Sequence, residues 1–460
     1  MKTRISEIRV AGLQEIYNYT VKFPDSSDVV IIIAPNGFGK TALLALLNSC
    51  LQFKLAEAAS KSFSTLDILF DNGTRWRFEK TRERRVTAET DKRHAIRYKR
   101  QMRPREWVKV IFYDRSGREI EDVKVGGVDA IPPDLLYRTL DRSLPISRYN
   151  FDTFLDAASG EILNVLELIN KYKNQLINDE YFKEGLGSYS KLLFSSNEDF
   201  VNCVFIETQR LLYSKKANPQ EPNSSSVTEE EVTRQSKHLS TLLKNTYSDY
   251  AATSQALDRS FPSRLITRAS MPNVKDVTNL RSELDSIEKR RSDLTKAGIL
   301  VETSEPLIAP KDEFLGNVAD ALAIYVEDSR AKLSTFDALY PKVSVFKNLL
   351  NKKLAPKELH ISQAGANIRR GTKEINLEGL SSGEKHEFIM LFRLVFETPP
   401  NSLVLIDEPE ISLHVLWQLE FMSDLMDIQG ANPFQAIIAT HSPQIFEGVE
   451  GLIVDLADQV

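Results

Sequence analysis

The sequence is poor in cysteine: its 460 residues include only two, Cys50 and Cys203. Neither belongs to a pair with metal-ligand or disulfide spacing. This scarcity excludes a disulfide-stabilised secreted domain and a cysteine zinc site. It is typical of a protein of the reducing cytosol.

Long apolar runs and a strong net charge are also absent. No stretch approaches the roughly 18 uncharged residues of a membrane-spanning helix, and the N-terminal "MKTRISEIRVAGL" lacks the apolar core of a signal peptide. We therefore expect a soluble, cytoplasmic protein without membrane contact. The formal net charge is only −5, so any contact with nucleic acid has to be local.

The N-terminal part of the sequence has an α/β pattern. The segments "ISEIRV" and "YTVKF" alternate like strands, and the apolar run 29–33 suits a strand buried in a parallel sheet. Leucines between Leu43 and Leu51 predict a helix directly after it. Hairpin patterns at 66–80 and around Ser116-Gly117 predict an antiparallel β meander.

The middle of the sequence is helical in pattern. Helical spacing occurs at 161–177, and Leu280, Leu284, Ile287, Arg291 and Leu294 are spaced alternately by four and three residues. That spacing indicates a short coiled-coil seam of about two heptads. A polar stretch at 214–232 predicts a flexible loop.

The last part of the sequence is α/β again. We expect an N-terminal lobe at 1–215, a helical and coiled-coil insertion at 216–354, and a C-terminal lobe at 355–460. The expected fold class is α/β, with a parallel-sheet core and an antiparallel β meander split by a helical insertion.

The stretch "IIIAPNGFGKTALLALLNS", residues 31–49, resembles a phosphate-binding loop with one glycine missing. Gly37, Gly39, Lys40 and Thr41 fit the pattern G-x-x-x-x-G-K-[ST], but Ala34 occupies its first position. A chance "GKT" in a globular core is the alternative. If position 34 needed a positive φ, alanine would cost about 1–2 kcal/mol there.

Two adjacent carboxylates end the apolar strand pattern "LVLIDEPE", residues 403–410. Asp407 could reach the magnesium shell of a nucleotide, and Glu408 could act as general base for the attacking water. An ordinary acidic turn would explain the same letters. His441, at the tip of another apolar strand pattern, could contact a γ-phosphate, although a capped turn also explains it.

Upstream of these carboxylates, "LEGLSSGEKHEFIMLF" opens an apolar helix. Ser381 and Gly383 would stand at its N-terminus, where free N–H groups and the helix dipole favour a phosphate. In the alternative interpretation, Ser381 or Ser382 simply caps the helix and Glu384 completes a capping box.

In this order, the four motifs resemble the ATP-binding-cassette (ABC) ATPases of the SMC, RecF and OLD-like group, with a Walker A loop "APNGFGKT", signature "LSSGE", Walker B "LVLIDEPE" and H-loop "THSP". The resemblance covers both α/β parts and implies a P-loop NTPase with an ABC-type head. More narrowly, "LSSGEKHEFIMLFRLVF", "LIDEPEISLHVLWQ" and "IIATHSPQIF" are similar to the PtuA family, the ATPase subunit of Septu-type and certain retron antiphage systems. The partner in those systems is an HNH nuclease, PtuB.

The resemblance implies ATP and Mg²⁺ as ligands and assigns roles to individual residues. Lys40 would neutralise the β- and γ-phosphates, Thr41 and Asp407 would hold Mg²⁺, Glu408 would polarise water, and His441 would sense the γ-phosphate. Ser381, Gly383 and Glu384 would reach the nucleotide of an opposing subunit, so that ATP joins two heads. The implied phosphate cradle is Asn36, Gly37, Phe38, Gly39, Lys40, Thr41 and Ala42.

Three further positions can be compared with the family pattern. Gln209, in "FIETQRLL", stands where these ATPases carry a metal-contacting glutamine, although a plain surface glutamine is the alternative. Glu384 stands where many cassettes carry glutamine, but glutamate at this position is common in the SMC/RecF branch. His414 stands where transporters carry aspartate, which argues against a transporter head.

Residues 75–109 are strongly basic, with 14 lysines and arginines against five acidic residues. Tyr98, Trp76 and Trp107 are interleaved with them, which would allow base stacking as well as phosphate contact. Neutralising Arg97, Lys99, Arg100 and Arg103 should then weaken nucleic-acid or partner binding but not ATP binding. A solvated hairpin rim is the alternative.

Four functions are compatible with these patterns. The first is the ATPase subunit of a PtuA-like complex that controls an HNH nuclease, with a retron reverse transcriptase or noncoding RNA as further partners. The others are a RecF-like repair ATPase, an ATP-dependent clamp with negligible turnover, and an OLD-type nuclease. An OLD-type nuclease carries a Toprim domain after the ATPase, and only about 15 residues follow "THSPQIF".

Overall fold

The computed structural model describes most of the chain in two compact units. The described residues are 3–83, 105–126, 139–148, 153–157, 162–164, 168, 171–172, 175–176, 178–180, 201–207, 212–214, 228–269, 277–301, 312–411 and 413–460. Unit 1 comprises Met1–Gln209, Thr398–Ser423 and Asn432–Val460, and unit 2 comprises Arg210–Glu397 and Asp424–Ala431. Residues 355–397, which we expected in the C-terminal lobe, therefore lie in unit 2.

A five-stranded parallel sheet forms one layer of unit 1, in the order β11-β17-β18-β3-β19. Its strands are β3 Val29–Ile33, β11 Cys203–Ile206, β17 Leu403–Asp407, β18 Gln435–Ala439 and β19 Ile453–Asp455. The three central strands, β17, β18 and β3, are almost entirely buried, as their continuous apolar runs predict. Segments from both ends of the chain thus form one sheet.

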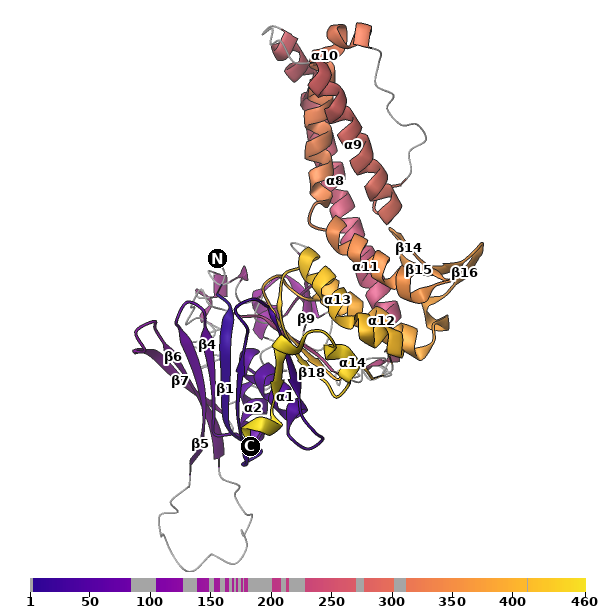
Figure 1. The fold of residues 1–460 in the computed structure, drawn as a ribbon. Coiled ribbons are helices and arrows are strands. Elements are labelled where there is room, and N and C mark those ends of the chain that lie inside the picture. The colour runs from indigo at the N-terminus through magenta and orange to yellow at the C-terminus, as the bar shows by residue number, and fades with distance from the viewer. Residues whose placement is uncertain are drawn as a thin grey trace, which may run out of the picture. The chain divides into compact units, whose positions relative to one another are not determined.

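The predicted antiparallel meander is confirmed as a six-stranded sheet in the order β2-β1-β4-β5-β6-β7 (Figure 1). Its strands are β1 Ile5–Leu13, β2 Tyr17–Lys22, β4 Thr65–Phe70, β5 Arg75–Glu83, β6 Arg105–Tyr113 and β7 Glu119–Gly126. Helices α1, Lys40–Leu51, and α2, Leu55–Ser60, pack in the same unit.

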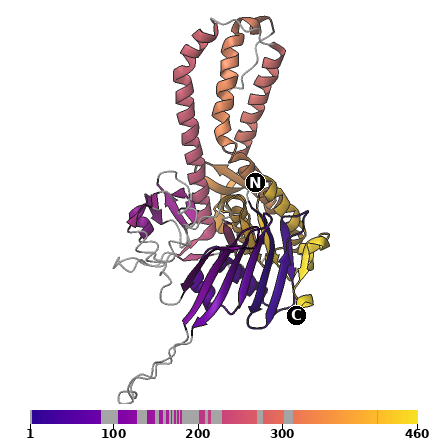
Figure 2. The ribbon, with the colours of Figure 1, turned by 90° about the vertical axis from the view of Figure 1, so that its left-hand side faces the viewer.

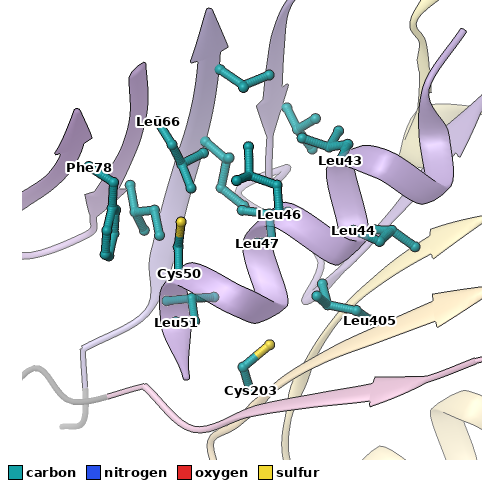
Figure 3. Packing of buried hydrophobic residues seen from close by; sticks show 14 of the residues in the cluster. Leu43, Leu44, Leu46, Leu47, Cys50, Leu51, Leu66, Phe78, Cys203 and Leu405 are labelled. Carbon is teal, nitrogen blue, oxygen red and sulfur yellow. The ribbon is translucent and has the colours of Figure 1, made fainter. Parts of the chain in front are cut away.

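Helix α1 contributes buried leucines to the hydrophobic core of unit 1. Figure 3 shows its leucines between Leu66 and Phe78 of the antiparallel sheet and Leu405 and Cys203 of the parallel sheet. Cys50 and Cys203 are both buried free thiols, and burial raises the pKa of each above its ordinary value. They act as small apolar core residues.

A small antiparallel sheet corrects one helix prediction. Its strands are β8 Ile146–Arg148, β9 Thr153–Asp156 and β10 Ile162–Asn164. The helix that we predicted over 161–177 is therefore wrong at its start, because Ile162–Asn164 pair with β9. A stretch of three residues is too short for periodicity to distinguish a strand from a helix.

Unit 2 contains the long helices, of which α10 packs against both α8 and α9 (Figure 2). The helices are α8 Glu231–Ala269, α9 Val277–Ala297, α10 Asp312–Leu333, α11 Tyr340–Leu354 and α12 Ser382–Phe392. The four apolar residues of the predicted seam are buried in α9, and Arg291 is half-buried. Helix α13, Val415–Ala431, belongs to unit 1 up to Ser423 and to unit 2 beyond it.

The remaining elements of unit 2 are short. They are β12 Leu212–Ser214, β13 Thr228–Glu230, β14 Glu358–Ser362, β15 Gly365–Arg370, β16 Lys373–Ile375, two 3-10 turns at Ser334–Phe336 and Leu377–Gly379, and a π-helical turn at Arg393–Glu397. Both ends of the predicted loop 214–232 are regular structure, since β12 pairs with β13 and α8 follows at once; residues 215–227 lie outside the described residues. No helix among the described residues is long and apolar enough to span a membrane.

A buried ionic network in unit 2 makes its stability depend on pH. Burial would raise the pKa of Glu397, but Arg234, the hydrogen bond from His238 and Arg393 outweigh it and lower the pKa from 4.5 to about 2. A depressed carboxylate pKa contributes stability above the unfolded-state pKa, and this contribution is lost as pH falls toward the folded-state pKa.

We therefore expect the stability difference between wild type and Glu397→Gln to shrink by about 2 kcal/mol between pH 6 and pH 3. Urea unfolding followed by circular dichroism at the two pH values measures it. Exposed Glu374→Gln, on β16, is the control and should show a smaller change. A difference between wild type and Glu397→Gln that does not vary with pH would contradict the assignment.

Candidate functional site

The loop between β3 and α1 has the backbone of a phosphate-binding loop without needing a glycine at position 34. Positive φ values occur at Gly37 (93°) and Gly39 (78°), and Ala34 is not among the described residues with positive φ. Ala34 therefore does not bear the strain that a positive φ would impose on an alanine. Gly39 is the N-cap of α1. Because glycine has no side chain, it cannot accept a capping hydrogen bond from the first N–H groups of the helix. Asn36 is exposed, Phe38 is half-buried, and Ala42 lies in the first turn of α1.

The carboxyl ends of β3, β17 and β18 meet at one edge of the parallel sheet. β18 pairs in parallel with both β17 and β3. The loop of Lys40, the carboxylates that end β17 and the histidine that follows β18 are therefore neighbours, as expected for a ligand site of an α/β sheet.

Lys40 connects these segments directly. Its Nζ donates to the carbonyl oxygen of Ala34 at 2.8 Å and lies 2.5 Å from Nε2 of His441. Burial lowers the pKa of Lys40, while Glu408, Asp407 and nearby acidic charge oppose this shift. The Lys40 ammonium is thus buried, and the acidic charge around it favours its protonated form.

Thr41 and Asp407 form a pair of hard oxygen ligands. Thr41 Oγ1 donates to Asp407 Oδ2 at 3.0 Å and lies 3.1 Å from Oδ1. Burial raises the pKa of Asp407, against the effect of the Thr41 hydrogen bond. A hydroxyl and one carboxylate are a partial set that Mg²⁺ completes with phosphate oxygens and water. No group of three or more His, Cys, Asp or Glu side chains suited to a metal occurs in the described part of the chain.

Glu408 has a backbone conformation unusual for a residue with a side chain. Its φ is +46°, and its N–H donates to the carbonyl oxygen of Ala439 at 2.8 Å. Its Oε1 lies 3.7 Å from Nε2 of His441. Residues held in this sparsely populated region cluster at functional sites.

Two tyrosines of β2 bind the backbone of the loop between β3 and α1. The sequence patterns assigned no role to them. The Tyr17 hydroxyl donates to the carbonyl of Gly37 at 3.2 Å, and the Tyr19 hydroxyl donates to that of Phe38 at 2.8 Å. The Tyr17 ring stacks on Tyr19 and on Phe38. Burial, with the neighbouring Tyr17, raises the pKa of Tyr19 to about 12, so it remains a donor at neutral pH. Alternating aromatics in a strand gave no signal for this role.

We expect Tyr19→Phe to weaken nucleotide affinity about fivefold, because one hydrogen bond contributes on the order of 1 kcal/mol. Turnover at saturation should change less, since the ring that supports the loop is retained. Calorimetric titration with Mg-ATP measures the affinity. Tyr113→Phe on β6, in the same unit, is the matched control; an equal loss in that variant would contradict a specific role for Tyr19.

Unit 2 contains the predicted signature residues at the start of α12. Ser381 is the N-cap, and Glu384 closes a capping box by accepting from the Ser381 N–H at 2.8 Å. Lys357 Nζ donates to both Glu384 carboxylate oxygens at 2.8 Å. Gly383 lies in the first turn. The capping interpretation is confirmed, and a role of these residues toward a nucleotide stays a prediction.

Gln209 lies outside the described residues. β11 ends at Ile206, three residues before it. Its assignment as a metal-contacting residue therefore stays a prediction.

Two arginines in the described part of the basic segment make structural contacts within the antiparallel sheet. Arg77 donates to both oxygens of Asp67, at 2.7 and 2.8 Å, and Arg75 lies over the Tyr113 ring. Trp76 is only 2% exposed and packs against aromatic core residues, so its predicted role in base stacking is wrong. The prediction rested on charge and aromatic content, which do not reveal that Trp76 faces the core. Arg97, Lys99, Arg100 and Arg103 lie outside the described residues.

Comparison with known proteins adds family information to this geometry. A family model described as "AAA domain" matches residues 7–300, and a second, described as "AAA domain, putative AbiEii toxin, Type IV TA system", matches residues 208–447. Each match spans more than half of the chain. Protein ea59 of Escherichia phage lambda is 41% identical over 70 residues, which are 15% of this chain and 13% of that protein.

Solved structures with a similar arrangement include SMC head domains. The head domain from Pyrococcus furiosus bound to the C-terminal domain of ScpA aligns over 98% of this chain and 93% of its own, with 13% identity and a TM-score of 0.33. The head domain from Thermotoga maritima aligns over 97% and 92%, with 12% identity and a TM-score of 0.32. The two family models, and not these structural likenesses, assign the chain to a family.

Proposed function

Because this chain belongs to the AAA-domain family of ATPases, we propose that the site in unit 1 binds ATP with Mg²⁺ and hydrolyses the γ-phosphate. One observation carries the proposal. Lys40, Asp407 and His441 come from three distant segments and meet at the carboxyl edge of one parallel sheet.

Phosphate binding would use the loop and its lysine. Lys40 would exchange its contacts with Ala34 and His441 for the β- and γ-phosphates. The backbone N–H groups of residues 36–41, freed by the positive φ of Gly37 and Gly39, would surround the phosphates. Thr41 and Asp407 would hold Mg²⁺, which supplies charge neutralisation of the triphosphate.

Hydrolysis would use Glu408 and His441. Glu408 would accept the proton of the attacking water. Its φ of +46° and its backbone bond to Ala439 fix the start of the side chain at the sheet edge. His441 lies between Lys40 and Glu408 and would donate to a γ-phosphate oxygen.

Calorimetric titration of the whole chain with ATP, with and without Mg²⁺, tests binding, and phosphate release tests turnover. We expect a saturable heat of ATP binding, a higher affinity for ATP when Mg²⁺ is present, and release of phosphate. Absence of heat with Mg-ATP would overturn the proposal. Heat without phosphate release would instead favour an ATP-dependent clamp.

The finer role that we propose is that of a PtuA-like regulatory ATPase. Ser381, Gly383 and Glu384 would contact the nucleotide of a second copy, so that ATP pairs two heads and controls an associated PtuB-like HNH nuclease. Two observations support this role. The signature, Walker B and H-loop sequences are similar to those of the PtuA family, and Ser381 is exposed. A RecF-like repair ATPase is the competing role.

Purification of the chain with the products of neighbouring genes distinguishes these roles. Co-elution of an HNH protein, a reverse transcriptase or a noncoding RNA supports the defence role. Nuclease activity of the purified complex should then differ with and without ATP. DNA binding without such a partner would favour repair.

A further inference from the structure

We propose that Glu410, two residues beyond Glu408, is a positioning residue that fixes the H-loop through one carboxylate oxygen and keeps the other for a donor that enters with the nucleotide. The inference rests on the proposed ATPase activity. The Walker A, signature, Walker B and H-loop roles leave this residue without an assignment.

The first observation is a direct bond to the H-loop backbone. The His441 N–H donates to Glu410 Oε1 at 2.8 Å. The ring of the same histidine lies 2.5 Å from Lys40 Nζ and 3.7 Å from Glu408 Oε1. Glu410 therefore fixes the backbone of the residue whose side chain links the phosphate-binding lysine and the general base.

The second observation is a closed set of bonds around the same loop. Ser442 Oγ donates to Gln418 Oε1 at 2.7 Å. Gln418 Nε2 in turn donates to the carbonyl oxygens of Leu413, at 3.1 Å, and Glu410, at 3.4 Å. Glu410 is thus held by its main chain while its side chain holds the loop, an arrangement that limits movement of His441.

The third observation is the unused oxygen. Glu410 Oε2 is buried and has no hydrogen-bond partner among the described residues. An unsatisfied buried polar group is destabilising, and more so when it is charged. A carboxylate oxygen kept in this state needs an explanation, and a donor that arrives with the substrate supplies one. The donor class we assign is ordered water of the nucleotide's hydration shell.

Charge strengthens this interpretation. The Glu410 carboxylate acts electrostatically on both Lys40 and Asp407, so it belongs to the same cluster of charged groups. A further negative charge there opposes binding of a triphosphate. Removing Glu410 should therefore lower turnover without weakening affinity for the triphosphate.

Two substitutions separate the two oxygens. Glu410→Gln retains one oxygen for the His441 N–H and loses the second acceptor, and Glu410→Ala loses both. We expect kcat to fall about tenfold in the glutamine variant and about a hundredfold in the alanine variant, because a hydrogen bond to a charged group contributes about 1.5–3 kcal/mol. Affinity for Mg-ATP should stay within about threefold of wild type in both. Glu447→Gln, an exposed carboxylate six residues after His441, is the matched control.

A double-mutant comparison distinguishes positioning from a general loss of structure. If Glu410 acts through His441, then most of the effect of Glu410→Ala should disappear in a His441→Ala background. Full additivity, or wild-type kcat in both Glu410 variants, would overturn the inference. In either case hydrolysis by the wild type would leave the proposed function intact, whereas a wild type without ATP binding would remove both.

Discussion

Replacing Glu408 by glutamine is expected to lower phosphate release about a thousandfold while the chain still binds Mg-ATP. General-base catalysis contributes roughly 10²- to 10⁴-fold to enzymatic rates. Glutamine has nearly the same shape and can occupy the strained backbone position, at φ +46°, that Glu408 already adopts. It cannot accept the proton of water. Single-turnover phosphate release and calorimetric titration, done in parallel, separate the two effects.

The same substitution should stabilise paired heads if ATP joins two copies. Loss of hydrolysis would let the ATP-bound form accumulate, so light scattering should show a larger mass with ATP than without it only in the Glu408→Gln chain. Glu447→Gln controls for the removal of a carboxylate. Equal rates of phosphate release in wild type and Glu408→Gln would instead identify a clamp that turns ATP over negligibly.

The sheet core could be predicted from the sequence because its strands are unusual. The strands at 29–33, 403–407 and 435–439 are buried on both faces. Strands of this kind have nearly continuous runs of apolar residues in the sequence. Lys40, Thr41, Asp407 and His441 follow directly from them, since each stands at a strand's carboxyl end or in the loop beyond it. Motif and strand together therefore placed these side chains correctly at one edge.

Other parts of the site and fold depend on tertiary contacts of single side chains. The sequence pattern does not reveal these contacts. Trp76 lies in a basic, alternating stretch, yet its side of β5 faces the core. Tyr17 and Tyr19 look like ordinary strand aromatics, and only the tertiary structure brings their hydroxyls to the loop carbonyls. Glu410 resembles one more acidic residue of a turn. Its role depends on the loop after β18, about 30 residues later in the sequence.

The unit boundaries show a similar limit of periodicity. Residues 357–380 return to strand-like alternation and an apolar helix pattern follows them, so we expected residues 355–397 in the C-terminal lobe. In the structure, β14 and β15 pack with α11 and α8, and α12 packs with α11, so the segment counts with unit 2. Alternation identifies a half-buried strand but not the sheet or helix that covers it.

Replacing Lys40 by methionine should reduce affinity for Mg-ATP by about two to four orders of magnitude. Charge-assisted hydrogen bonds contribute roughly 1.5–3 kcal/mol each, and Lys40 would make two to the phosphates. The substitution also leaves the carboxylates of Asp407, Glu408 and Glu410 without their shared cation, so their repulsion of the triphosphate grows.

Methionine keeps most of the length of the side chain, so the buried stem of Lys40 continues to pack and the fold should persist. Calorimetric titration against ATP measures the loss, and circular dichroism confirms that the helices remain. Lys385→Met is the matched control, because Lys385 is a lysine of unit 2 that forms an ion pair with Glu230. Tight ATP binding by the Lys40→Met chain would mean that the triphosphate does not use this loop. His441 and the carboxylates at the sheet edge would then serve a different ligand.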